Sequence, residues 1–98
     1  MKTSIAIQIM PKGVNDSEKI RIIDCCIDYI AKTGLNYEVG PFETSIEGDS
    51  VEELLDIVKD LQDLGVKEGA TTMATFMKLW YSPKGVMTIE EKTEKHRH

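Results

Sequence analysis

The spacing of apolar residues changes along this chain in a fixed order, and that order restricts the possible folds more than any other feature. Between residues 4 and 10 an isoleucine stands at every second position, which indicates a half-buried strand. From about residue 18 to 32 the spacing becomes three or four residues, as in an amphipathic helix. Two short strand patterns, a second helical pattern and a long fourth strand follow. The order is therefore β-α-β-β-α-β.

The first helix is expected from about residue 18 to 32. Asp16 or Ser17 can cap its start, and Gly34 can end it in a left-handed conformation. Apolar residues at helical spacing predict one buried stripe, made of Ile20, Ile23, Ile27 and Ile30.

The second helix is expected to begin after Ser50, with Glu53 completing a capping box, and to stop at Gly65. Its predicted stripe consists of Val51, Leu54, Leu55, Val58 and Leu61. A short helix from residue 88 to about 95 is predicted by a further capping-box pattern, formed by Thr88 and Glu91.

The remaining strands are predicted at residues 37–40 and 43–48, joined by a Gly-Pro turn, and at residues 71–81. This order predicts an α+β, ferredoxin-like βαββαβ fold: a four-stranded antiparallel sheet with two helices on one face and a short C-terminal helix. The 98 residues suit a single domain, 1–98.

Composition excludes several classes of function. No apolar run approaches the ~20 residues that cross a bilayer, and no signal-peptide layout opens the chain, so we expect a cytoplasmic protein without a membrane partner. The net charge of -5 repels phosphate backbones and argues against nucleic acid.

Catalytic and metal-binding motifs are not found in the sequence. Cys25 and Cys26 are helical neighbours that cannot form an unstrained disulfide; we expect Cys26 to pack as a small hydrophobe and Cys25 to be more exposed. His96 and His98 form a terminal pair without a third ligand. We therefore expect no enzyme, no metal and no cofactor.

Strand alternation divides the sheet into two faces. The face toward the helices is expected to carry Ile5, Ile7, Ile9, Val39, Ile46, Met77 and Leu79. The opposite, open face mixes apolar and polar groups: Ala6, Gln8, Met10, Glu38, Ser45, Glu47, Ala74, Phe76, Lys78 and Trp80. Such a face predicts an interface or a binding groove, covered by a second subunit, a ligand, or both.

Several of these residues can bind a small molecule. Glu47 and Gln8 need hydrogen-bond partners if the face is covered, and a carboxyl group can engage an aminopyrimidine. Phe76, Trp80 and Tyr37 offer flat surfaces, although Tyr37 lies on the helix side and reaches a ligand only at the strand end. Thr44 and Ser45 point to opposite faces, so a given ligand touches at most one of them. Lys78 is the eighth residue of this predicted ligand-binding set. Each of the eight also has an ordinary structural interpretation, such as the solvated charge of Lys78.

The segments Tyr37-Glu38-Val39-Gly40-Pro41, Thr44-Ser45-Ile46-Glu47-Gly48 and Met87-Thr88-Ile89-Glu90-Glu91-Lys92 resemble the small thiamine-binding protein family. The resemblance implies a ferredoxin-like fold, homodimers or homotetramers built through the sheets, and binding of thiamine or its hydroxymethylpyrimidine moiety in salvage or transport. The matching positions are Gln8, Tyr37, Thr44, Ser45 and Glu47. Lys78 stands where relatives often have acidic residues, which favours a neutral or anionic ligand.

Two alternatives remain open. The chain can be an oligomeric regulatory or structural module whose open face binds no thiamine ligand. An acylphosphatase-like enzyme on the same fold needs an arginine in the turn after the first strand, where this chain has Lys12 and Gly13; its arginines are Arg21 and Arg97.

Overall fold

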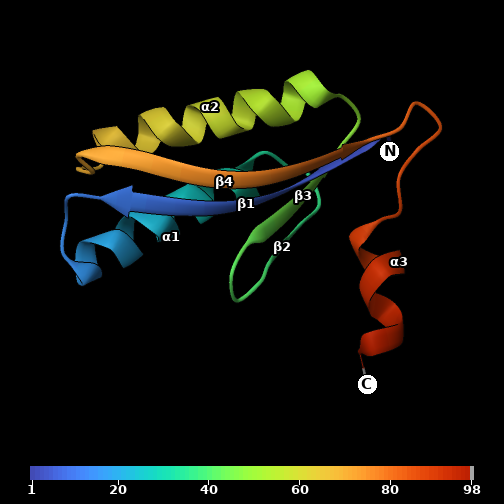
Figure 1. Cartoon of the computed structure of the whole chain (residues 1–98), viewed down its shortest axis with the longest axis horizontal. Helices are drawn as coiled ribbons and strands as arrows, with labels where there is room; N and C mark the ends of the chain where they lie inside the picture. Colours follow the sequence, from blue (N-terminus) through green and yellow to red (C-terminus); the bar gives the residue numbers. More distant parts are fainter. Residues whose placement is uncertain (98) are drawn as a thin grey trace.

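The computed structural model describes residues 1–97 and confirms the predicted order of elements (Figure 1). The strands are β1 (Thr3–Lys12), β2 (Tyr37–Val39), β3 (Thr44–Gly48) and β4 (Thr72–Tyr81). The helices are α1 (Asp16–Lys32), α2 (Val51–Lys67) and the short α3 (Ile89–Thr93), which continues into a 3₁₀ turn, Glu94–His96.

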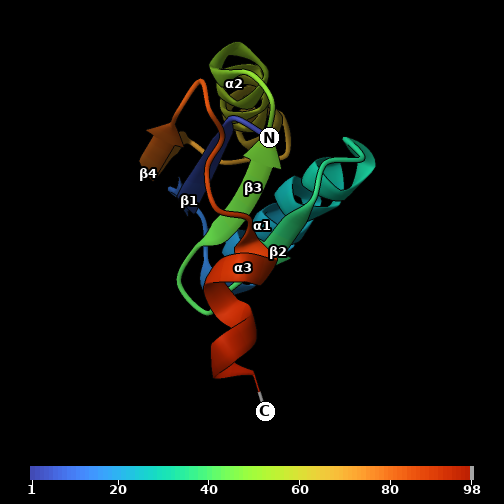
Figure 2. The same cartoon turned by 90° about the vertical axis from the view of Figure 1, so that its right-hand side faces the viewer.

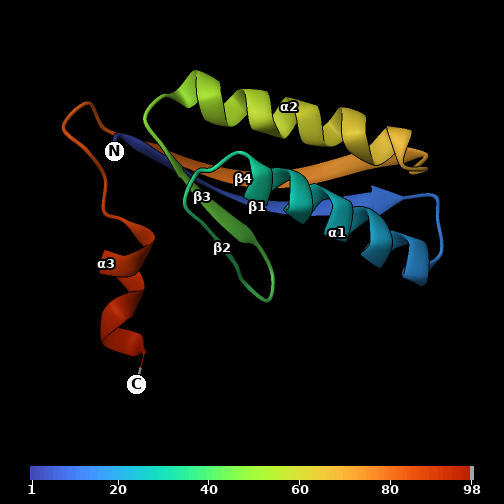
Figure 3. The same cartoon turned by 180° about the vertical axis from the view of Figure 1, so that it is seen from behind.

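The four strands form one antiparallel sheet in the order β2-β3-β1-β4. Helices α1 and α2 lie side by side on one face of it, as the views from the end and from behind show (Figures 2 and 3). The opposite face is open except where the C-terminal segment, residues 82–97, turns back toward β3 (Figure 2). This is the predicted ferredoxin-like α+β architecture.

The core lies between the sheet and the two helices. The sheet contributes Ile5, Ile7 and Ile46, all at most 2% exposed. Helix α1 contributes Ile22, Cys26 and Ile30, and α2 contributes Leu54, Ile57 and Leu61. Spacings of three and four place each helical set on one side of its helix, so burial of these side chains supplies the main stabilisation of the layered fold.

The stripe predicted for α1 was wrong in part. Ile30 is buried, but Ile20 is 61% exposed, and Ile23 and Ile27 are only half-buried, because the helix turns the neighbouring row that includes Ile22 toward the sheet. Helix α1 therefore carries two adjacent apolar stripes, and periodicity alone does not decide which one is buried. On α2 the prediction differs less: Leu55 is 40% exposed and Ile57 is buried in its place.

The helix ends follow the predictions with small shifts. Asn15, not Asp16 or Ser17, caps α1, its side chain accepting from the Glu18 backbone N–H at 2.9 Å. Gly34 has the predicted positive φ, +79°. Ser50 caps α2, but the Glu53 carboxylate accepts from the Asp49 N–H at 3.4 Å, so the predicted capping box is incomplete.

Gly65 does not end α2, which continues to Lys67. A Cβ at Gly65 would lie 2.3 Å from Sδ of Met73 on β4, closer than any ordinary contact. The glycine thus permits close packing of helix against strand, a tertiary requirement that outweighs its poor helix propensity.

Strand β3 is much shorter than its neighbour β1, and this difference positions the candidate site. β1 pairs with β4 along its whole length but with β3 only from Thr3 to Ile7. On the β3 side, the second half of β1, residues 8–12, has no strand partner among the residues that the structure describes. Pro11, which cannot donate to a ladder, lies in this half.

The C-terminal helix α3 has the predicted capping box, with Thr88 and Glu91 each accepting from the other's backbone N–H. Hydrogen bonding from Thr88 lowers the pKa of the Glu91 carboxyl. Ile89 is its buried residue. Within residues 1–97, none of the helices combines the length and apolar character that crossing a membrane requires.

Candidate ligand-binding site

The strand register confirms how the predicted open-face residues lie relative to one another. Three rows cross the sheet: Glu47, Ser4 and Trp80 form the first, and Glu38, Ser45, Ala6 and Lys78 form the second. In the third row Gln8 pairs with Phe76, and no β3 residue stands on its other side. The open face therefore narrows from four strands to two toward the Gln8 end.

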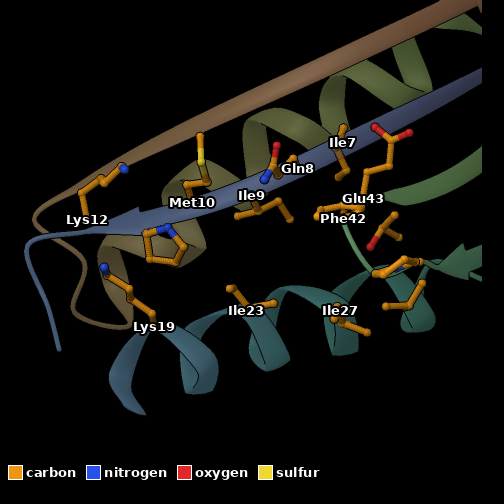
Figure 4. A pocket seen from close by; sticks show the side chains of 15 residues that line it. Ile7, Gln8, Ile9, Met10, Lys12, Lys19, Ile23, Ile27, Phe42 and Glu43 are labelled. Atoms are coloured by element: carbon orange, nitrogen blue, oxygen red, sulfur yellow. The ribbon is translucent and has the colours of Figure 1, made fainter. Parts of the chain in front are cut away.

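A groove opens beside Thr44, the first residue of β3, where β1 continues without a strand partner on that side within residues 1–97. We call it the edge groove (Figure 4). It has a volume of about 450 Å³ and lies between the second half of β1, helix α1 and the β2–β3 turn, residues 39–44. Ile23 and Ile27, from the stripe of α1 that the sheet does not cover, project into it (Figure 4). An apolar floor with a few polar groups is typical of small-molecule sites.

The polar end of the edge groove lies at the β2–β3 turn. Glu43 and Gln8 line this end, and both also line an adjoining hollow of about 280 Å³ with Phe76, Met77 and Lys78. The Lys78 ammonium lies 3.1 Å from Oε1 of Glu43. The charge of Lys78 is therefore balanced by a carboxylate on the hairpin, and an amide, a carboxylate and an aromatic ring meet in one place.

A second concavity, the tail pocket, lies between the open face and α3. Its volume is about 250 Å³, and its lining includes Ser45, Lys78 and Trp80 from the sheet with Ile89 and Lys92 from α3. The Lys92 ammonium lies over the Trp80 ring, 5.1 Å from its centroid, in a cation–π arrangement. One face of the Trp80 ring is thus already occupied by a cation of the same chain.

Glu47 holds the C-terminal helix to the sheet. Its side chain is buried, one carboxylate oxygen accepting from the Ile89 backbone N–H at 2.7 Å and the other from the Asn36 side-chain amide. Both donors come from the protein itself. The ligand role predicted for Glu47 stays a prediction, and it competes with this anchoring of α3.

The other two hairpin residues predicted for the site lie on the helix side of the sheet. Thr44 is 7% exposed and lines the edge groove. Tyr37 is half-buried and packs against the core. Of the eight predicted residues, Gln8, Thr44, Phe76 and Lys78 gather at the polar end of the edge groove or in its adjoining hollow. Ser45 and Trp80 line the tail pocket, which Lys78 also borders.

Sequence reasoning missed Glu43 and Phe42 as site residues. Phe42, 80% exposed at the turn, lines the edge groove beside Glu43. The sequence did contain a signal for them. An aromatic residue beside a carboxylate in a short turn, Phe42-Glu43, is poorly placed to pack in the core and is therefore a candidate for binding. Residue spacing does not show that β1 extends five residues beyond Ile7, the last of its residues to pair with β3, and so leaves room beneath the turn.

The remaining reactive and charged groups have structural roles. Burial raises the pKa of the Cys26 thiol to about 11, and this side chain is fully buried as predicted, with Cys25 the more exposed. The Arg21 guanidinium bonds to Glu18 and Glu68, which raises its pKa and places it outside the turn after β1. Within residues 1–97 no group of three His, Cys, Asp or Glu side chains could hold a metal ion; His98 lies outside the described residues.

Comparison with known proteins adds an independent observation. Residues 5–97 match the family model described as thiamine-binding protein. A UPF0045 protein of Clostridium perfringens is 40% identical over 94 residues, covering 96% of each chain.

Two solved structures share the fold. A domain of unknown function, DUF77, from Bacillus cereus has a TM-score of 0.86 at 33% identity over 99% of this chain and 91% of that one. A Thermotoga maritima protein, described as a candidate thiamine biosynthesis or salvage protein, has a TM-score of 0.85 at 35% identity over 99% and 100% of the two chains. Given this match across nearly the whole chain, the protein belongs to the thiamine-binding protein family.

Proposed function

We propose that this protein is a cytoplasmic binding protein for thiamine or its hydroxymethylpyrimidine moiety, acting in thiamine salvage or transport without turning its ligand over. Membership of the thiamine-binding family supports the ligand class. The observation that carries the location is the convergence of Gln8, Glu43 and Phe76 at the end of an apolar groove.

The chemistry of an aminopyrimidine suits this end of the edge groove. The ring offers nitrogen acceptors and an exocyclic amine that donates. The Gln8 amide can both donate and accept, and the Glu43 carboxylate has a second oxygen beside the one that Lys78 engages. Phe76 supplies a flat surface for stacking. A ligand bound here needs no displacement of α3, unlike one bound through Glu47.

Calorimetric titration with thiamine and with hydroxymethylpyrimidine tests the proposal. We expect both to bind, and Gln8→Ala and Glu43→Gln each to weaken binding about tenfold, the value of one hydrogen bond to a charged or well-placed polar partner. Glu52→Gln is the matched control for charge, because Glu52 is an exposed glutamate on α2. If neither thiamine nor hydroxymethylpyrimidine binds, the proposed function is refuted.

The site assignment has its own test within the same experiment. Glu47→Gln separates the two candidate carboxylates: loss of binding in that variant, with Glu43→Gln unchanged, would move the ligand from the edge groove to Glu47. The opposite result supports the edge groove.

Self-association through the sheet is part of the proposal. Strand β4 pairs only with β1 among the described residues, and five of its large apolar side chains are 39% to 67% exposed: Phe76, Met77, Leu79, Trp80 and Tyr81. An apolar strand left open in this way favours burial against a second copy. We propose a homodimer or homotetramer in which β4 is covered.

A further inference from the structure

Two lysines lie at the end of the edge groove opposite Glu43. Lys12 is the last residue of β1, and Lys19 lies in the second turn of α1, so strand and helix each bring one ammonium group to the same end (Figure 4). Ile23, Ile27 and Phe42 line the stretch between the two ends. The groove thus has one end with a carboxylate and an amide, an apolar middle and a cationic end.

The positive charge at this end is only weakly compensated. Within residues 1–97, Lys12 forms no ion pair, and Lys19 has only Asp16, 3.9 Å away on a side chain that is 99% exposed. At the other end, the single lining carboxylate, Glu43, is already paired with Lys78. In a chain whose net charge is -5, the groove therefore carries a local excess of positive charge. Such a site attracts an anion rather than a cation.

The length of the groove adds a second constraint. Gln8 and Lys12 are four residues apart on an extended strand, which separates their Cα atoms by about 13 Å. A single pyrimidine ring bonded to Gln8 and Glu43 leaves the lysine end empty. Thiamine spans more of the groove, but its second ring is a cation, which the lysines repel.

We propose that the edge groove binds a phosphate ester of thiamine, with the aminopyrimidine at Gln8 and Glu43 and the phosphate between Lys12 and Lys19. The inference rests on the thiamine-related function proposed above. Phosphate supplies the negative charge that lysines recognise as point charges, and it compensates the thiazolium cation. Discrimination between thiamine and its ester is thereby assigned to Lys12 and Lys19.

Titration of the intact protein with thiamine and with thiamine monophosphate tests this assignment. We expect the ester to bind about tenfold more tightly than thiamine at low ionic strength, and this preference to shrink at ~1 M salt, because exposed ion pairs are screened. Lys12→Gln combined with Lys19→Gln should remove the preference and raise the affinity for thiamine, because the two ammonium groups that repel its thiazolium cation are gone. Inorganic phosphate should compete with the ester and not with thiamine.

Lys59→Gln is the matched control, since Lys59 is an exposed lysine on α2, away from the groove, and should keep the full preference. If thiamine binds as tightly as its ester, or if the double variant keeps the preference, this inference is overturned and the binding function stands. If neither compound binds, both are overturned.

Discussion

At the scale of single residues, the pairing of Lys78 with Glu43 changes what Lys78 means for the ligand. In the sequence Lys78 stands alone among apolar residues of β4 and indicates a positively charged open face. In the structure its ammonium lies 3.1 Å from the carboxylate on the neighbouring hairpin. The unbalanced positive charge is instead at Lys12 and Lys19, at the far end of the edge groove. The proposed preference for an anionic ligand therefore rests on Lys12 and Lys19, not on Lys78.

Two glycines with similar backbone angles allow a test of local packing. Gly13 and Gly34 have φ of +82° and +79°, but a Cβ at Gly13 would lie 2.2 Å from Oγ1 of Thr71, whereas nothing lies within 4 Å at Gly34. We expect Gly34→Ala to lower the free energy of unfolding by about 1 kcal/mol, from the positive φ alone. Gly13→Ala should cost about 2–4 kcal/mol, because overpacking adds to the same strain. Equal effects in urea unfolding would contradict this reading of the turn.

The two neighbouring cysteines should differ sharply in reactivity. Cys26 is fully buried with a pKa of about 11, so its thiolate is scarce and inaccessible at neutral pH. Cys25 is partly exposed. Alkylation of the native protein, followed by mass spectrometry of its peptides, should modify Cys25 and leave Cys26 free until denaturant is added. Modification of both at one rate would indicate that α1 opens readily.

At the scale of elements, α3 depends on one buried carboxylate more than on its own length. Five residues form too short a helix to be stable alone. Glu47→Gln keeps the shape but weakens the charged acceptor of the Ile89 N–H, so we expect hydrogen exchange at Ile89 to accelerate about tenfold. Glu90→Gln, an exposed change on the same helix, is the control. Unchanged protection in Glu47→Gln would show that the capping box and Ile89 suffice.

The elements also show how far the sequence could predict this molecule. Order, sheet faces and most helix ends follow from spacing and capping residues, because these are local signals. Other features depend on neighbours that are distant in sequence. These are the choice of which apolar stripe of α1 is buried and the continuation of α2 beyond Gly65. The same holds for the site. Gln8 could be singled out as a central polar residue, but Glu43 is seen to line the same groove only because β1 extends beyond its last partner on β3.

At the scale of the whole molecule, the open strand β4 predicts the state of assembly. A chain of 11.0 kDa with this apolar edge should sediment as a dimer or tetramer. Phe76→Lys, on the open face, should shift the protein toward monomer, because burying an unpaired ammonium in an interface is unfavourable. Phe42→Lys is the control, because Phe42 is an even more exposed aromatic and lies at the hairpin turn. A monomeric parent protein would refute the proposed assembly.

The unequal lengths of β1 and β3 have a consequence for how such a protein can diversify. The edge groove is bounded by the β2–β3 turn, the end of β1, and Ile23 and Ile27 of α1. The fold is stabilised instead by the buried row of α1, which is Ile22, Cys26 and Ile30, and by the paired half of the sheet. The proposed ligand site and the stability of the fold therefore depend on largely separate sets of residues. Substitutions or insertions in the turn can alter what is bound while the core stays intact, which allows one scaffold to acquire new specificities in small, individually tolerated steps.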